Sequence, residues 1–308
     1  MNRKTIILLT LLIAANIGAW IVFMPKKDSS VSTEDLSRFP HLSRRVLVDN
    51  PNDTIINFVS LRKSLTAKLD KVQGQKSLYF EYLPSGTSIG IGDDNDLVAA
   101  SLLKLPMVMN LYKAAELGRL DLDSTVTLQA SDIDGDYGSL WKMGVGHKLT
   151  LRQAASLILT DSDNTATRAV FSKLRGILKE DEQSMSQLDI EQKLQNGQAV
   201  INAKSYSSIL RSLYLSSYLS KSNSEELLDN LTKSKETRRL TRDLPNSVSV
   251  AHKNGVYNSS WSESDCGIVF APKRPYMLCI MVGLPDEQAN DLIASISKEV
   301  YEYISRQN

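Results

Sequence analysis

The sequence of 308 residues contains only two cysteines, Cys266 and Cys279. That number is too small for a disulfide-rich scaffold or a cysteine-rich metal site. Both lie in strand-like segments, so a bridge is geometrically possible, but two buried thiols are what we expect. The three histidines, His41, His147 and His252, are scattered without the spacing of metal ligands. We therefore expect neither a metal site nor a cofactor.

An excess of one charge is also missing, because 36 Lys and Arg stand against 35 Asp and Glu, for a net charge of +1. A nucleic-acid-binding protein needs a surplus of basic charge to neutralise phosphates, so that class is excluded. The hydrophobic content of 42% is enough to bury a core, which excludes a disordered chain. No internal repeat or low-complexity tract is present.

Long apolar runs are absent except for one, at residues 5–24, which has no charged residue and is followed by Lys26 and Lys27. At 1.5 Å per residue it would span roughly 30 Å, the thickness of a bilayer core. A cleavable signal peptide has a shorter apolar region, and the possible cleavage site at 17–19 is poor. An uncleaved signal anchor is therefore favoured, with a cleaved signal as the alternative.

The expected organisation follows from this run. Residues 1–4 form a cytoplasmic stub, 5–24 a transmembrane signal anchor, 25–53 a polar tether and 54–308 one folded domain. A short N-terminus inside and a large domain outside is the usual orientation for such an anchor. We expect a membrane-anchored monomer with an extracytoplasmic domain.

The folded part has an informative order of elements. Helix-like spacing comes first, two strands around a turn follow, then a long and mostly helical block, three strand-like runs and a last helix. These segments are 55–72, 76–92, 101–240, 247–251, 266–270, 277–282 and 286–305. We expect an α/β (α+β) fold in which a five-stranded antiparallel sheet, flanked by N- and C-terminal helices, carries an inserted helical subdomain. A groove between sheet and insertion would be a natural site.

Ser101 and Lys104 are three positions apart, so on a helix they face the same side. A serine hydroxyl is a weak nucleophile that needs a base, and a desolvated lysine near another cation loses its proton readily. The same spacing occurs elsewhere, but here Ala99 and Ala100 precede it and the apolar run 102–109 follows. We expect a buried helix whose first turn carries both groups and offers free N–H groups to an oxyanion.

Two further motifs follow along the chain. Ser162-Asp163-Asn164 comes after a helical apolar run, where capping residues are ordinary. Lys253-Asn254-Gly255 comes directly after the strand at 247–251, where the lysine could be merely exposed or could hold a substrate carboxylate. Either motif alone carries little weight, whereas three in this order are specific.

Together these motifs resemble the penicillin-recognising serine hydrolases, and class A β-lactamases most closely. The resemblance extends over about 54–308 and predicts the β-lactamase/transpeptidase-like fold. It rests on the segments 99–106, 116–123, 149–152, 162–167, 244–245, 251–255 and 265–269.

The resemblance implies a role for each matching residue. The acylated nucleophile would be Ser101, its proton acceptor Lys104, and the proton shuttle to the leaving nitrogen Ser162. Asn164 would bind the substrate amide and steady the lysine, and Lys253 would attract the substrate carboxylate. The remaining substrate contacts would be Asn254, Gly255 and, at the groove mouth, Tyr137, with an oxyanion hole from the N–H groups of Ser101 and Val256.

The sequence departs from the family pattern in two places. Asn254 stands where the family has Thr or Ser. The loop Glu-x-x-Leu-Asn of class A β-lactamases, whose glutamate activates the hydrolytic water, has no clear counterpart. Glu191 is the nearest candidate, but it falls too early before the helix expected at Ala203, and an exposed charge is the favoured interpretation. Without that glutamate, hydrolysis of the acyl-enzyme should be slow.

A basic cluster precedes the third motif and is expected to be a solvated face, with contact to an anionic wall polymer or lipid as the alternative. Its members are Lys233, Lys235, Arg238, Arg239 and Arg242.

The sequence as a whole predicts a serine acyl-enzyme hydrolase acting on β-lactams or acyl-D-Ala-D-Ala peptides. The alternatives are a D,D-peptidase-like cell-wall enzyme and a non-catalytic wall-binding module.

Overall fold

The structure is a computed structural model that describes residues 56–306. The stub, anchor and tether expected at 1–4, 5–24 and 25–53 lie outside the described residues. Between residues 56 and 306, no helix is both long and apolar enough to cross a bilayer.

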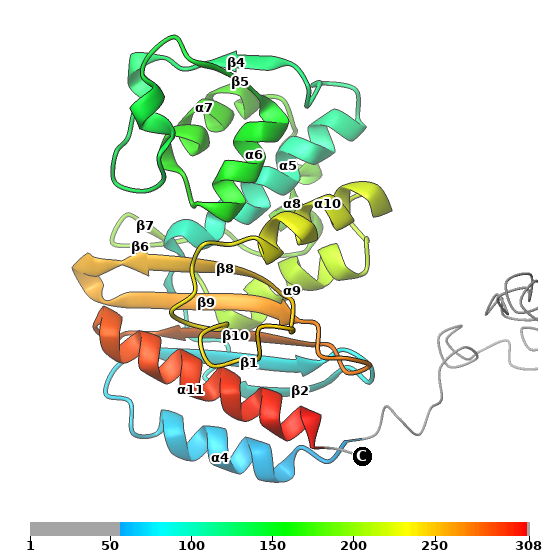
Figure 1. Cartoon of the computed structure of the whole chain (residues 1–308), viewed down its shortest axis with the longest axis vertical. Coiled ribbons are helices and arrows are strands. Elements are labelled where there is room, and N and C mark those ends of the chain that lie inside the picture. Colours follow the sequence, from blue (N-terminus) through cyan, green and yellow to red (C-terminus); the bar gives the residue numbers. More distant parts are fainter. Residues whose placement is uncertain (1–55, 307–308) are drawn as a thin grey trace, which may run out of the picture. The chain divides into compact units, whose positions relative to one another are not determined.

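A five-stranded antiparallel sheet is built from both ends of the described chain, as predicted (Figure 1). Its strand order is β2-β1-β10-β9-β8, so that β8 forms one edge. The strands are β1 (Lys76–Tyr82), β2 (Thr87–Ile91), β8 (Val250–Tyr257), β9 (Ser262–Val269) and β10 (Tyr276–Val282).

Two terminal helices cover one face of this sheet, and the helical insertion covers the other (Figure 1). The terminal helices are α4 (Val59–Leu69) and α11 (Asp286–Ser305), the second with the predicted bounds. The inserted α-helices are α5 (Lys104–Glu116), α6 (Leu151–Thr160), α7 (Asn164–Leu174), α8 (Ser184–Gln187), α9 (Ala203–Tyr214) and α10 (Lys221–Thr232).

Short elements connect these helices. Strands β3 (Leu97–Val98), β7 (Gln198–Ile201) and β6 (Lys193–Gln195) make a small sheet in that order, and β4 (Thr125–Thr127) pairs with β5 (Lys148–Thr150). The 3-10 helices are η2 (Ala100–Leu103), η3 (Ala130–Asp132), η4 (Leu140–Met143), η5 (Glu180–Glu182) and η6 (Asn258–Ser260).

Strand β10 shows how the sheet divides the core into two parts. Met277, Cys279 and Met281 belong to the cluster formed with the insertion, whereas Leu278 and Ile280 belong to the cluster under the terminal helices. Successive side chains of a strand point to opposite faces, so this continuous apolar run serves both layers. Each fully buried side chain of this size contributes about 1.5–3 kcal/mol to folding.

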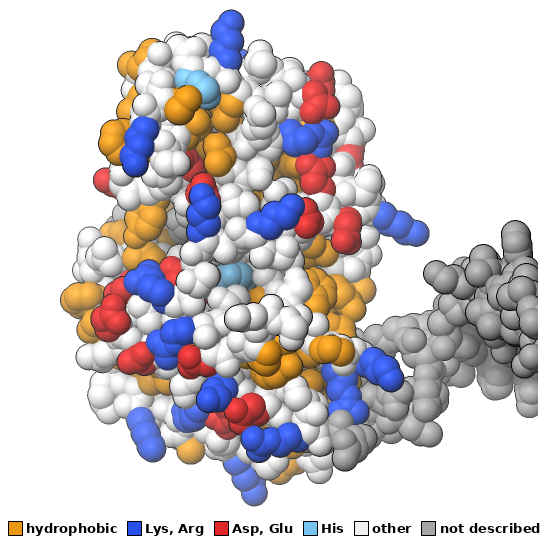
Figure 2. Space-filling view, in the orientation of Figure 1, with side chains coloured by type: hydrophobic (Ala, Val, Ile, Leu, Met, Phe, Trp, Pro, Cys, Tyr) orange, Lys and Arg blue, Asp and Glu red, His pale blue; other side chains and the backbone are white. Residues whose placement is uncertain are grey.

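The charged surface agrees with the balanced composition. Figure 2 shows Lys and Arg side chains interspersed with Asp and Glu over the face in view, without a large field of either sign.

Strand β8 is longer than predicted. The expected strand ended at Ala251, with Lys253-Asn254-Gly255 after it, but the structure places this motif inside the strand. The register explains the difference, because Lys253 is opposite Cys266 and Gly255 is opposite Ser264 on β9. Pairing with a central strand thus overrides the low strand propensity of these residues.

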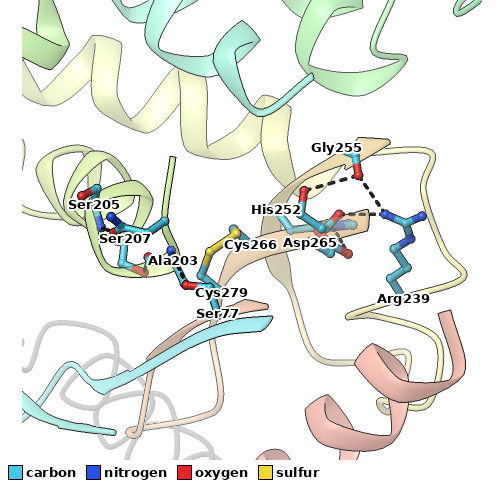
Figure 3. The surroundings of a disulfide bond; sticks show 12 residues. Ser77, Ala203, Ser205, Ser207, Arg239, His252, Gly255, Asp265, Cys266 and Cys279 are labelled. Atoms are coloured by element: carbon cyan, nitrogen blue, oxygen red, sulfur yellow. Dashed lines mark hydrogen bonds and ion pairs between the residues drawn. A yellow bond between two sulfur atoms is a disulfide. The ribbon is translucent and has the colours of Figure 1, made fainter. Parts of the chain in front are cut away.

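The expectation of two buried thiols is wrong, since Cys266 and Cys279 form a disulfide (Figure 3). The two residues are directly opposite each other on β9 and β10, and both face the insertion. The antiparallel register therefore brings together two side chains that the sequence separates by 13 positions.

This bridge predicts that protein unfolded without reductant has no titratable thiol. Replacing both cysteines, Cys266→Ala with Cys279→Ala, should lower the free energy of unfolding by about 3 kcal/mol, because the bridge no longer restricts the unfolded chain. A longer closed loop would contribute more. Urea unfolding of both proteins measures the difference. Two free thiols per chain in freshly unfolded protein would contradict the bridge.

Candidate active site

Ser101 and Lys104 lie where η2 passes into α5, at the start of a helix buried in the core. Leu102 and Leu105 have no exposed surface, and Lys104 is itself buried, while Ser101 is half-buried. Pro106 is accommodated because it lies in the first turn of α5, where its missing N–H costs no helical hydrogen bond. The local sequence thus places a hydroxyl at the surface of a helix whose adjacent amine is kept from water.

The Lys104 ammonium has three donors and directs all of them at the second motif. Lys104 Nζ donates to the Ser162 carbonyl oxygen at 2.5 Å, to Asn164 Oδ1 at 2.6 Å and to Ser162 Oγ at 3.2 Å. An ammonium with three acceptors is well held despite its burial. Ser162 and Asn164 therefore come together with Lys104, as the spacing of the motifs suggested.

Lys253 reaches the same hydroxyl from the sheet. Lys253 is 1% exposed, and its Nζ donates to Ser162 Oγ at 3.1 Å and to the Asn254 carbonyl oxygen at 3.1 Å. Asn254 Oδ1 accepts a third hydrogen bond from it at 3.2 Å. The Ser162 hydroxyl thus stands between two lysine amines that come from α5 and β8.

Two non-glycine residues of this region have left-handed backbone conformations. Ala100, directly before Ser101, has φ 45°, and Ser162 has φ 53°. Such conformations are uncommon for residues with a Cβ and cost on the order of 1–3 kcal/mol each. They turn the chain so that the hydroxyls of Ser101 and Ser162 lie at the N-terminal ends of α5 and α7.

Asp163, the middle residue of its motif, holds two segments together. Its fully buried carboxylate accepts hydrogen bonds from Ala166 N, which caps α7, and from the N–H groups of Ser139 and Leu140, all at 2.8 Å. The predicted capping role is thus present. It also fixes the loop that carries Tyr137, whose carbonyl oxygen accepts from Asn164 N at 3.1 Å.

Gly255 lets the edge strand approach the serine-bearing segment. A Cβ at this position would lie 2.6 Å from Ser264 Oγ and 2.9 Å from the Ala99 carbonyl oxygen, which is closer than real contacts allow. Val256 follows on β8 and is half-buried. Because β8 is an edge of the described sheet, every second backbone N–H along it points away from β9.

Tyr137, for which the resemblance implied a substrate contact, has 43% of its surface exposed.

The prediction that the basic cluster is a solvated face is wrong for Arg239, because this side chain has no exposed surface. Its guanidinium forms a buried ion pair with Glu263 and donates to the Ser264 carbonyl oxygen at 2.8 Å and to the Gly255 carbonyl oxygen at 3.2 Å. It also donates to Asn290 Oδ1 at 2.7 Å. Burying a charge requires such partners, which sequence spacing alone does not reveal.

His252 and Asp265 form a second buried pair beside this one, with His252 Nδ1 2.9 Å from Asp265 Oδ1 (Figure 3). The His252 side chain points away from Lys253, as alternation along a strand predicts. Burial alone would raise the pKa of Asp265, but His252, Arg239 and the Leu240 N–H lower it. The pair anchors β8 to β9 at the position next to Lys253.

Burial also sets the protonation of the two lysines. It lowers the pKa of Lys104 to about 8, against the opposing effect of the Asp163 and Asp134 carboxylates. Burial, with the neighbouring Lys104 cation, lowers the pKa of Lys253 to about 7. Like charges near one hydroxyl disfavour each other, so the pair sheds a proton more readily than free lysines do. An amine whose pKa lies near physiological pH is present partly in its neutral form there, and that form can act as a general base.

Comparison with known proteins gives the family. Residues 60–304 match the family described as "Beta-lactamase enzyme family", which is most of the chain. The chain belongs to this family. It is a serine hydrolase of the β-lactamase type, and its relatives support that assignment.

The chain is similar to two β-lactamases of Pseudomonas aeruginosa, PSE-4 over 229 residues and CARB-3 over 226, each 25% identical across 68% of this chain and 77% of the relative. A solved structure of PBP-A superimposes with a TM-score of 0.73 at 25% identity, covering 81% of this chain and 97% of that one. A β-lactamase from Sphaerobacter thermophilus, 20% identical, has the same fold with a TM-score of 0.73, over 82% of this chain and all of that one.

A cavity of about 450 Å³ lies behind Lys104, between α5, α7 and the segment that follows α7. Class A β-lactamases need a carboxylate to activate the hydrolytic water, but no aspartate or glutamate of the described residues lines this cavity. Glu191 is exposed and is not part of the wall, although Gln192 is. Apolar side chains make up most of the wall: Leu103, Pro106, Met107, Phe171, Leu174, Leu178 and Met185.

Sequence reasoning missed two contributors to the site. Asp134 accepts a hydrogen bond from Asn164 Nδ2 at 3.1 Å and forms an ion pair with Arg168. The hairpin β6–β7 occupies the segment after α8, and its two-residue turn Asn196-Gly197 has positive φ at both residues. Asn-Gly is the strongest short hairpin signal and could have been recognised, whereas no sequence pattern marks Asp134.

The close approach at Gly138 gives a test with a matched control. A Cβ on Gly138 (φ 84°) would lie 2.1 Å from Asp163 Oδ2, while a Cβ on Gly144 (φ 78°) would meet nothing within 4 Å. Gly144→Ala should cost about 1 kcal/mol for the backbone alone. Gly138→Ala should cost clearly more, as measured by urea unfolding. Equal losses for the two variants would contradict the tight packing of Asp163.

Proposed function

We propose that the protein is a membrane-anchored, extracytoplasmic serine acyl-enzyme hydrolase that acts on β-lactams or acyl-D-Ala-D-Ala peptides and deacylates slowly. The observation that carries this proposal is the Ser162 hydroxyl held between Lys104 Nζ and Lys253 Nζ, with Ser101 three residues before Lys104. This arrangement provides a nucleophile, a base and a route for a proton within one small region. The type of chemistry in this proposal is inferred from membership of the β-lactamase family.

Acylation would begin with proton transfer from Ser101 Oγ to the neutral Lys104 amine. The Ser101 oxygen then bonds to the substrate carbonyl carbon, and the C–N bond of the amide breaks. The leaving nitrogen needs a proton, which the Ser162 hydroxyl supplies while it recovers one from Lys104. The hydrogen bonds of Ser162 to both lysines support this relay.

The substrate carboxylate would bind beside Lys253 and Asn254, close to Ser162. Its negative charge favours the protonated form of Lys253, and a charged Lys253 in turn favours a neutral Lys104. The N–H groups of Ser101 and Val256 would bind the developing oxyanion. Substrate binding thus prepares the base for its task.

Three further residues, Asn164, Gly255 and Tyr137, would hold the rest of the substrate. Asn164 uses Oδ1 for Lys104 and Nδ2 for Asp134 in the free protein, so binding a substrate amide requires it to share these groups. Gly255, which has no Cβ, lets the backbone of β8 lie close to the substrate. The exposed ring of Tyr137 can pack on an apolar substituent.

Slow deacylation follows from the composition of the cavity behind Lys104. A hydrolytic water needs a base to become nucleophilic, and the wall offers no carboxylate; its amine, Lys104, is already bound to Ser162 and Asn164. The ester at Ser101 should therefore outlive the step that forms it. Conventional β-lactam resistance demands rapid turnover, which this site does not favour.

A D,D-peptidase-like enzyme is the second candidate, and one specific observation favours it. PBP-A is among the similar structures, and a mutant of PBP-A is known as an acyl-enzyme complex with penicillin G. A non-catalytic wall-binding module is less well supported, since a binder needs no hydroxyl shared between two lysines.

The membrane location rests on the sequence alone. The uncharged run at 5–24 is long enough to span a bilayer, and the polar residues at 25–53 would place the hydrolase domain at a distance from it. Such a tether would let the site reach polymer near the membrane surface.

The acylation rate at saturating penicillin is predicted to rise with pH, with a midpoint at or below about 8. Only the neutral Lys104 amine accepts a proton, its pKa is lowered to about 8 in the free protein, and a Lys253 kept charged by the substrate carboxylate lowers it further. Stopped-flow acylation by a saturating fluorescent penicillin between pH 6 and 9.5 measures this profile. Lys104→Arg stays protonated and should acylate about 10²–10⁴-fold more slowly. A wild-type rate that is flat over this range would argue against Lys104 as the base.

Intact-mass analysis with the same penicillin tests the acyl-enzyme. Wild type should gain one stable adduct that Ser101→Ala does not form, and Glu191→Gln should leave the adduct lifetime unchanged within about twofold because that carboxylate lies outside the cavity. A short-lived adduct with rapid release would favour a β-lactamase, and a lifetime lengthened in Glu191→Gln would identify the missing base. The absence of any wild-type adduct would contradict the proposed function.

A further inference from the structure

A second cavity, of about 360 Å³, lies along the continuation of the edge strand beyond the candidate active site. It begins at Val98, three residues before Ser101, and reaches Tyr257, two residues after Gly255. Ser262 Oγ donates to the Val98 carbonyl oxygen at 2.9 Å, which joins these two sides. The remaining wall residues are Gln75, Leu97, Gln195, Asn196, Gln198, Ser259, Trp261 and Gly283.

The chemistry of this wall is unusual because no charged residue lines the cavity. Amide side chains from three segments (Gln75, Gln195 and Gln198) are combined with two aromatic residues, Tyr257 and Trp261. Amides can both donate and accept hydrogen bonds, and aromatic faces pack on apolar C–H surfaces. That combination suits a neutral saccharide with its alternating hydroxyls and C–H faces. It does not suit an acidic polymer, which would require cations.

Both turns that border the cavity hold their residues in left-handed conformations. Trp261 has φ 50° and is 50% exposed, although a large aromatic residue rarely adopts that conformation. On the opposite side, Asn196 and Gly197 form the tight turn between β6 and β7. The two turns present an indole and a set of amides at the same cavity.

A second hollow borders the cavity. A neighbouring hollow of about 570 Å³ shares Gln75 and Gln195 in its wall and extends to Asp94 and Asp96. Asp96 is already occupied, since it accepts hydrogen bonds from Lys193 and Asn202.

The distance from the catalytic groups also fits. Tyr257 is four residues beyond Lys253 on an extended strand, about 13 Å at 3.3 Å per residue. A peptide whose terminal carboxylate lies at Lys253 and whose scissile carbonyl lies near Val256 must lead away toward Tyr257. About four extended peptide residues cover that distance. Whatever is attached to the amino end of such a peptide arrives at this cavity.

We propose that the cavity between the β6–β7 turn and Trp261 is a subsite for the neutral, N-acetylated glycan to which the substrate peptide is attached. This inference rests on the proposed function for its orientation, but sugar binding is measurable without acylation. It makes wall polymer, rather than a free peptide or β-lactam, the preferred ligand.

The test uses the full-length chain, purified in detergent, and the tetramer of N-acetylglucosamine as the probe. Calorimetry gives the affinity, and tryptophan fluorescence in a double variant, Trp20→Phe with Trp141→Ala, reports on the Trp261 indole alone, because the sequence has three tryptophans. Trp261→Ala and Gln195→Ala should each weaken binding about tenfold or more. Trp141 is 38% exposed and lies outside the cavity wall, so Trp141→Ala should bind as wild type does.

Acylation by fluorescent penicillin, measured on the same preparations, keeps the two proposals apart. Trp261→Ala should acylate within about twofold of wild type, which also shows that it is folded. Failure of the tetramer to bind wild type at millimolar concentration, or equal binding by Trp261→Ala, would overturn the glycan subsite. Loss of penicillin acylation in wild type would instead overturn the proposed function.

Discussion

The hydroxyl of Ser162, held between the amines of Lys104 and Lys253, is the contact on which the site depends. It joins a helix of the insertion, the loop before α7 and the edge strand of the sheet. Two buried ammonium groups so close together repel each other and lose solvation. Hydrogen-bond acceptors on Asn164 and Asn254 offset part of this cost. The part of the desolvation and repulsion that is not offset lowers the pKa of both lysines.

The sheet keeps its half of this arrangement in place through a second buried network. Arg239 pairs with Glu263 and donates to the carbonyl oxygen of Gly255. His252 on β8 pairs with Asp265 on β9 and so connects the two strands. A buried ion pair adds little net stability, but removing one partner is costly. Its contribution is to hold the edge strand at the distance from α5 that Lys253 requires.

Regular elements and the order of the three motifs could be predicted from the sequence, because hydrophobic periodicity and short spacings are local. The last helix follows from that periodicity alone. The burial of Arg239 and the bridge between Cys266 and Cys279 depend on strand register, which brings distant positions together. Polar residues of β8 looked like the end of a strand because their partners lie on β9. The amide-rich cleft near Trp261 is likewise assembled from segments far apart in the chain.

Burial in this fold makes two lysine amines lose their protons far more easily than free lysines do. Nuclear magnetic resonance of selectively ¹⁵N-labelled lysine side chains, assigned with Lys104→Arg and Lys253→Arg, measures both titrations in the free protein. Two resonances should titrate near pH 8 and 7, well below the other lysines. If both amines titrated with the ordinary lysines above pH 10, the account would be contradicted.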